Sequence, residues 1–85
     1  KRVVVVGSNV RNVAESARKE GYDVFAITRY DDADLKLYAK VKKINSVKDR
    51  DLAKIVDGIA ESLNAKVILA SGCEHLPVKS EVIGT

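Results

Sequence analysis

The sequence has no tryptophan, methionine or glutamine, and it has only one cysteine, one proline and one histidine among 85 residues. A single cysteine cannot form an internal disulfide, so packing has to stabilise the chain. Apolar runs such as those at residues 3–6 and 67–70 are far shorter than the roughly 20 residues that a membrane-spanning helix needs. No signal-peptide pattern opens the chain. These absences predict a soluble, cytoplasmic protein with no membrane partner.

The chain also has no large excess of charge of one sign: its formal net charge is +3, and its pI is near 9.1. Lysine and arginine are interleaved with aspartate and glutamate, and the three tyrosines and one phenylalanine form no RNA-binding aromatic motif. We therefore predict no nucleic-acid partner. We interpret the charge as a solvated surface with a local preference for anions.

The length fits one domain over residues 1–85 and leaves no room for a second. We expect this domain to be excised from a longer protein, because the sequence stops at Gly84 and Thr85 directly after the last expected strand. A site formed between two domains cannot be complete in such a chain, so we expect no catalytic residue in it. The sequence leaves homo-oligomerisation open.

The first thirty residues carry the clearest structural pattern. The valine run at residues 3–6 does not alternate with polar residues, which is typical of a central parallel strand covered on both faces. An amphipathic helix is predicted over residues 10–20, and a second buried strand over residues 24–27 completes a right-handed βαβ unit. Turn and capping residues separate the elements of this unit. Gly7 is the expected turn residue, Ser8 and Asn9 are expected to form the N-cap, and Gly21 is expected to end the helix in the left-handed conformation.

The rest of the chain continues the alternation. We expect a polar loop at 28–34, a short helix at 34–40, an edge strand at 42–44, a long helix spanning 52–63, a strand at 67–70 and a further strand at 81–83. Ser46 and Asp49 match a capping box, and Asn64 is placed to end the long helix. The helical spacing of the apolar residues predicts one core-facing stripe, with Ile55 and Ile59 as core residues. The stripe consists of Leu52, Ile55, Val56, Ile59, Ala60 and Leu63. The fold class is α/β: a small three-layer Rossmann-like domain with a mostly parallel sheet of four to five strands and helices on both faces.

Ligands of such a sheet bind beyond the carboxyl ends of its strands. This rule selects three loops, at residues 7–11, 28–34 and 71–75. The first leads into a helix N-terminus, which favours an anion. We expect the first and fourth strands to be neighbours, so that their loops open onto one crevice. The predicted substrate- or anion-binding residues are Gly7, Ser8, Asn9, Arg11, Ser71, Gly72 and Glu74.

Other kinds of site fit less well. A dinucleotide fingerprint needs two further glycines where Asn9 and Asn12 stand, and Thr28 replaces the acidic residue that holds an NAD ribose. Cys73 and His75 are too few for a metal site, and a Cys73 nucleophile would also need oxyanion donors and a cleft. The acidic residues Asp31, Asp32 and Asp34 are more typical of a helix cap and a solvated face than of a magnesium site.

Four short segments, taken in order, resemble a known family. They are Val-Val-Gly-Ser-Asn-Val-Arg at residues 5–11, Gly-Tyr-Asp-Val at 21–24, Asp-Ala-Asp at 32–34 and Ser-Gly-Cys-Glu at 71–74. In this order and spacing they are similar to the amino-terminal, pre-ATP-grasp domain of predicted ATP-dependent carboligases, which are ATP-grasp proteins related to biotin carboxylase. The resemblance covers nearly the whole chain, and Ser8, Thr28 and Cys73 depart from the family's pattern.

The resemblance implies a division of labour between domains. ATP and Mg²⁺ are held mainly by the later ATP-grasp domains of the same parent chain, an acylphosphate forms on a small carboxylate substrate, and a nucleophile displaces phosphate. The pre-ATP-grasp domain borders the substrate, so Asn9 and Arg11 would orient a carboxylate and Glu74 would line the same cleft. The parent would be a ligase, and this chain alone would be inactive. The alternative is a free-standing Rossmann-like nucleotide- or anion-binding or regulatory module.

Overall fold

The structure is a computed structural model, and it describes residues 1–30, 33–45 and 47–83. Four parallel strands form one sheet in the order β3-β2-β1-β4. The strands are β1 (Arg2–Gly7), β2 (Asp23–Thr28), β3 (Lys40–Lys43) and β4 (Lys66–Leu69). The predicted neighbourhood of the first and fourth strands is confirmed, because β1 lies between β2 and β4.

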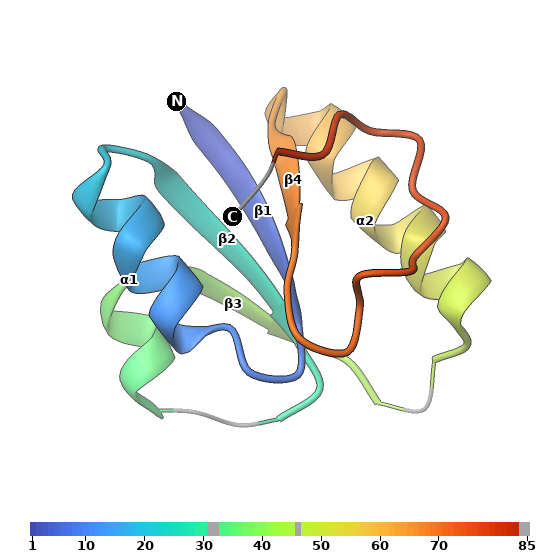
Figure 1. Cartoon of the computed structure of the whole chain (residues 1–85), viewed down its shortest axis with the longest axis horizontal. Helices are drawn as coiled ribbons and strands as arrows, with labels where there is room; N and C mark the ends of the chain where they lie inside the picture. Colours follow the sequence, from blue (N-terminus) through green and yellow to red (C-terminus); the bar gives the residue numbers. More distant parts are fainter. Residues whose placement is uncertain (31–32, 46, 84–85) are drawn as a thin grey trace.

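Helices cover both faces of this sheet, as Figure 1 shows. The helix α1 (Arg11–Lys19) and the short 3₁₀ helix η1 (Ala33–Leu37) pack on one face, and α2 (Asp49–Leu63) packs on the other. Val3 and Val5 belong to the core on the α1 side, whereas Val4 and Val6 belong to the core on the α2 side. All four valines are at most 1% exposed, which explains why this run does not alternate. The predicted three-layer α/β class is confirmed.

Both helices end as the sequence predicts. Gly21 has a φ of +92°, and the N–H groups of Gly21 and Tyr22 donate to the carbonyl oxygens of Arg18 and Ala17. This is a Schellman ending, which needs a left-handed residue after the helix. Asn64 ends α2 with a φ of +53°.

The predicted helix beginnings are wrong. The N-cap of α1 is Val10 rather than Ser8 or Asn9, because the chain needs these two residues for the turn that leaves β1. The N-cap of α2 is Lys48, and neither cap residue makes a side-chain cap hydrogen bond. The capping box therefore does not start α2 at the expected residue, and its Ser46 lies outside the described residues.

The predicted core face of α2 is confirmed at Leu52, Val56 and Ala60 but not at Ile55 and Ile59. Its buried residues are Leu52, Ala53, Val56 and Ala60. Ile55 and Ile59 are only half-buried. The buried face therefore includes the two alanines, and Ile55 lies at its side.

The expected fifth strand is reduced to a single parallel bridge between Val67 and Val82. The segment between β4 and this bridge runs back beside α2 towards the amino end of β4 (Figure 1). Asp57 of α2 holds this segment. Its carboxylate accepts from the backbone N–H groups of Lys79 and Ser80 at 2.9–3.1 Å and from the Ser80 hydroxyl at 2.7 Å. Within the described residues, the helices are too short or too polar to cross a bilayer.

Candidate functional site

The turn after β1 and the loop after β4 are in direct contact at the carboxyl edge of the sheet. The N–H of Ser8 donates to the carbonyl oxygen of Ser71 at 2.9 Å. A β-carbon on Gly7 would lie 3.0 Å from the β-carbon of Ala70, and one on Gly72 would lie 3.1 Å from the Ser8 hydroxyl. Glycine is therefore needed at both positions for this approach, and Gly72 also has a φ of +82°.

This contact brings four of the predicted binding residues together: Gly7, Ser8, Ser71 and Gly72. Asn9 and Glu74 are exposed on the same two segments. The two segments are separated by some sixty residues of sequence, and they meet because β1 and β4 pair in parallel with Val6 opposite Leu69. The backbone N–H groups at the start of α1 lie next to this contact, and such groups favour an anion.

Arg11 has a partner that the sequence did not reveal. Its Nη1 donates to Oδ2 of Asp34 in η1 at 3.0 Å, and both side chains are about half exposed or more. A cation in the first turn of a helix is unfavourable for the helix dipole, and the nearby Asp34 carboxylate offsets part of that cost. Asp34 therefore serves here as an ion-pair partner. Asp31 and Asp32 lie outside the described residues.

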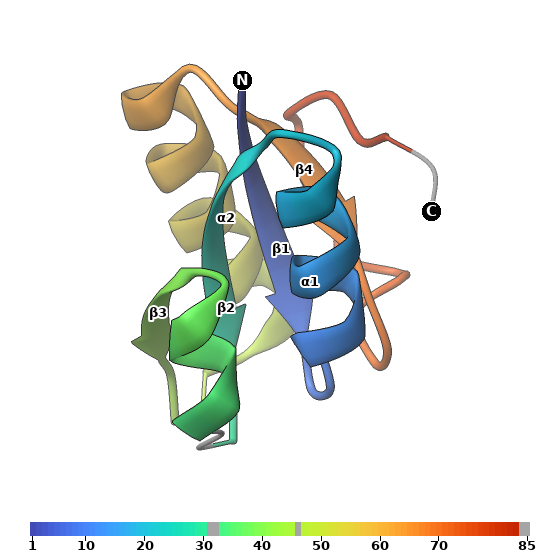
Figure 2. The same cartoon turned by 90° about the vertical axis from the view of Figure 1, so that its left-hand side faces the viewer.

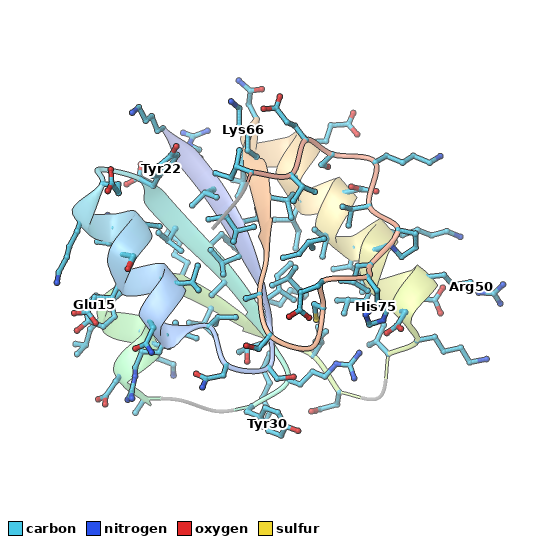
Figure 3. All side chains as sticks on the ribbon, viewed as in Figure 1. Glu15, Tyr22, Tyr30, Arg50, Lys66 and His75 are labelled. Carbon is cyan, nitrogen blue, oxygen red and sulfur yellow. The ribbon has the colours of Figure 1, made fainter. Side chains whose placement is uncertain are left out.

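A second polar cluster lies at the same end of the strands, and it was not predicted from the sequence. Oδ2 of Asp49, the first residue of α2, lies 2.7 Å from Nε2 of His75, and its Oδ1 lies 3.5 Å from Nη2 of Arg29. Figure 3 shows His75 beside the first turns of α2. The hydrogen bond from His75 is the main cause that lowers the pKa of Asp49; burial opposes this effect, and electrostatic attraction from His75 and Arg29 adds to it. The loop after the third strand was not among the three selected loops, so Asp49 was interpreted only as part of a capping box.

Cys73 lies in the core on the α2 side and is only 3% exposed. Burial raises the pKa of its thiol; the Arg29 charge opposes this rise, and the Asp49 and Glu74 carboxylates reinforce it. A nucleophilic cysteine needs the opposite environment, since the thiolate is the reactive form. The thiol of Cys73 is therefore a packing group.

Thr28 at the end of β2 is buried, and its hydroxyl is already engaged. It accepts from the N–H of Tyr30 at 3.2 Å and lies 3.3 Å from the Tyr30 carbonyl oxygen, to which it donates. Both contacts shape the turn after β2. The position that holds the ribose in NAD-binding domains is thus occupied here by a residue with a structural task.

Two clefts in the described part of the chain lie away from the carboxyl edge. One, of about 540 Å³, lies at the amino ends of β1, β2 and β3. The other, of about 490 Å³, lies between α1 and the side chains of Ile68 and Ile83. In the described residues no group of three or more histidine, cysteine, aspartate and glutamate side chains is arranged to hold a metal ion.

Comparison with known proteins assigns no relative to this chain: no family model, curated protein or solved structure matches it. A proposal for its function therefore rests on the contacts at the carboxyl edge and on the order of motifs along the chain.

Proposed function

We propose that this chain is the substrate-side, pre-ATP-grasp domain of an ATP-grasp ligase. The observation that supports this proposal is the contact between the turn after β1 and the loop after β4, with Ser8 N and Ser71 O 2.9 Å apart. The first and last of the family-like motifs, at residues 5–11 and 71–74, lie on these two segments. β1 is also the strand at which the strand order reverses. In open parallel sheets, ligands bind at that switch point.

The residues at this edge would bind a small carboxylate rather than transform it. The N–H groups at the start of α1 and the exposed amide of Asn9 are donors of the kind that a carboxylate accepts. Arg11 would add positive charge, but the ligand would have to compete with Asp34 for its guanidinium. Ser71 and Gly72 would form the opposite wall, and Glu74 would lie beside it.

The remaining parts of the reaction belong to the rest of the proposed parent chain. ATP supplies the phosphoryl group that turns the carboxylate into an acylphosphate, and the ATP-grasp domains would hold ATP and Mg²⁺. The glycine turn at residues 7–9 has a single glycine, and asparagine stands where a second would let a polyphosphate approach. We place the parent enzyme in the cytoplasm.

The test is a ligase assay on the full-length protein that contains this domain. We expect phosphate release from ATP to depend on an added carboxylic acid. Asn9→Ala should raise the KM for that acid about tenfold and leave kcat nearly unchanged, because Asn9 would bind the acid without touching the reacting bond. Asn45→Ala, at an exposed asparagine beyond β3, is the matched control and should leave both constants unchanged.

Two results would contradict the proposal. One is the lack of acid-dependent phosphate release with every member of a panel of small carboxylic acids. The other is a coding sequence beyond Thr85 that encodes no glycine-rich phosphate loop and no ATP-holding lysines. The second result would favour a free-standing anion-binding module.

A further inference from the structure

The cleft at the amino ends of the strands exists because β3 is shorter than its neighbour. β3 begins at Lys40, which pairs with Phe25, so that Asp23 and Val24 of β2 extend beyond it. Figure 2 shows β3 starting well below the amino ends of β1 and β2. The space that β3 leaves open is the cleft of about 540 Å³, within the range of about 300–1,000 Å³ that is typical of small-ligand sites.

Positive charge is concentrated around this cleft. Four of the fifteen basic residues of the chain line it, with only one of the twelve acidic residues, so that eleven of each remain elsewhere and balance. The lining cations are Arg2, Arg18, Lys36 and Lys40, and the acid is Asp23. The formal net charge of +3 thus equals the charge of the cleft's own lining.

Among the residues that the structure describes, two of these cations have protein partners and two do not. Arg18 pairs with Asp23 at 3.3 Å, and Arg2 donates to the carbonyl oxygen of Leu63 at the end of α2 at 3.2 Å. Lys36 and Lys40 are exposed, and among the described residues neither ammonium has a hydrogen-bond or ion-pair partner. They come from η1 and from the first residue of β3.

Two rings line the cleft from opposite faces of the sheet: Tyr38 packs against the core on the α1 side, and Phe25 packs against the core on the α2 side. Phe25 and Tyr38 are half-buried in its lining, and Leu37 stands at the same opening with 73% of its surface exposed. When an apolar group covers an exposed leucine and half-buried rings, apolar surface is removed from water, and this makes the free energy of binding more favourable. Rings that contact one another in stacked or edge-to-face arrangements add to this gain.

We propose that this amino-end cleft binds an aromatic anion of about mononucleotide size, a ring system that carries a phosphate or a carboxylate. The ring would contact Phe25 and Tyr38, and the anionic group would bind Lys36 and Lys40. The site is separate from the proposed substrate edge, which lies at the opposite ends of the same strands.

An NMR titration of the isolated chain tests this proposal, with AMP as the aromatic phosphate and benzoate as the aromatic carboxylate. We expect AMP, benzoate or both to shift amides at residues 23–25 and 36–40. The probe with the lower Kd identifies the anionic group that the cleft prefers. Adenosine and inorganic phosphate should each bind at least tenfold more weakly than AMP if the phosphate is the group recognised. Benzyl alcohol is the uncharged counterpart of benzoate.

The double variant Lys36→Gln/Lys40→Gln should raise the Kd of the preferred probe about tenfold, because it removes two exposed charge contacts. The control is Lys54→Gln, an exposed lysine on α2 that does not line the cleft, and it should change the Kd less than twofold. Leu37→Ser should also weaken binding without disturbing the core. The proposal is overturned if neither probe shifts these amides, if uncharged counterparts bind equally well, or if the double variant binds like the control.

Discussion

Replacing Gly7 by alanine probes the close packing between the turn after β1 and the loop after β4. The new methyl group would lie 3.0 Å from the β-carbon of Ala70 and 3.1 Å from both the Ala70 carbonyl carbon and the Ser71 carbonyl oxygen. Two of these three neighbours are backbone atoms. They are held by hydrogen bonds to β1 and its turn, Ala70 N to Val6 O at 2.8 Å and Ser8 N to Ser71 O at 2.9 Å. We expect Gly7→Ala to lower the free energy of unfolding by about 1–3 kcal/mol.

The same substitution at Gly58 is the matched control. Gly58 lies inside α2, where an added β-carbon would have no neighbour within 4 Å. Alanine is the better helix former and restricts the unfolded chain, so Gly58→Ala should raise the free energy of unfolding by about 0.4–1 kcal/mol. Urea denaturation followed by far-UV circular dichroism compares both variants with the parent chain. A Gly7→Ala variant as stable as the parent, or a destabilised Gly58→Ala variant, would refute the packing described here.

Three further predictions concern the core, the segment at residues 77–83 that Asp57 holds, and the activity of the purified chain. Leu52→Ala should lower the free energy of unfolding by about 2–5 kcal/mol and Ile55→Ala by less than about 1.5, because only Leu52 is fully buried; equal losses in urea denaturation would contradict this. Burial raises the pKa of Asp57, but the hydroxyl of Ser80 and the amides of Lys79 and Ser80 outweigh it and lower the pKa overall. This carboxylate therefore stabilises the fold above its unfolded pKa near 3.8, and its contribution is lost as the pH falls through the lower folded value. Asp57→Asn should remove that part of the acid dependence and expose residues 77–83 to faster hydrogen exchange; an unchanged exchange rate would count against the tether. The purified chain should not hydrolyse ATP, and turnover lost on mutation of one of its own residues would overturn that expectation.

The sequence predicted most of the sheet because burial on both faces leaves a direct mark. The unbroken valine run at residues 3–6 indicated a central parallel strand, and Gly21 and Asn64 indicated helix ends that require left-handed backbone. The helix beginnings were mispredicted because serine and asparagine serve turns as well as N-caps. At the turn after β1, the hydrogen bond from Ser8 to Ser71 favours the turn, and Ser71 is some sixty residues away in sequence.

The contact between the loops after β1 and β4 was predicted, but the ion pairs around it were not. A topological rule was enough to bring the loops after β1 and β4 together, because it depends only on which strands are neighbours. The partners of Arg11 and His75, in contrast, are aspartates on η1 and α2. Several exposed carboxylates could have paired with each cation, and exposed pairs differ by too little free energy for sequence to choose among them.

The most direct test of the substrate edge is an NMR titration of the isolated, isotope-labelled chain with acetate and with inorganic phosphate. We predict amide shifts at residues 7–11 and 71–74 that saturate together, and we expect Asn9→Ala to weaken this binding and Asn45→Ala to leave it unchanged. Shifts confined to the amino end of the strands, at residues 23–25 and 36–40, would contradict the assignment of this edge as the substrate side.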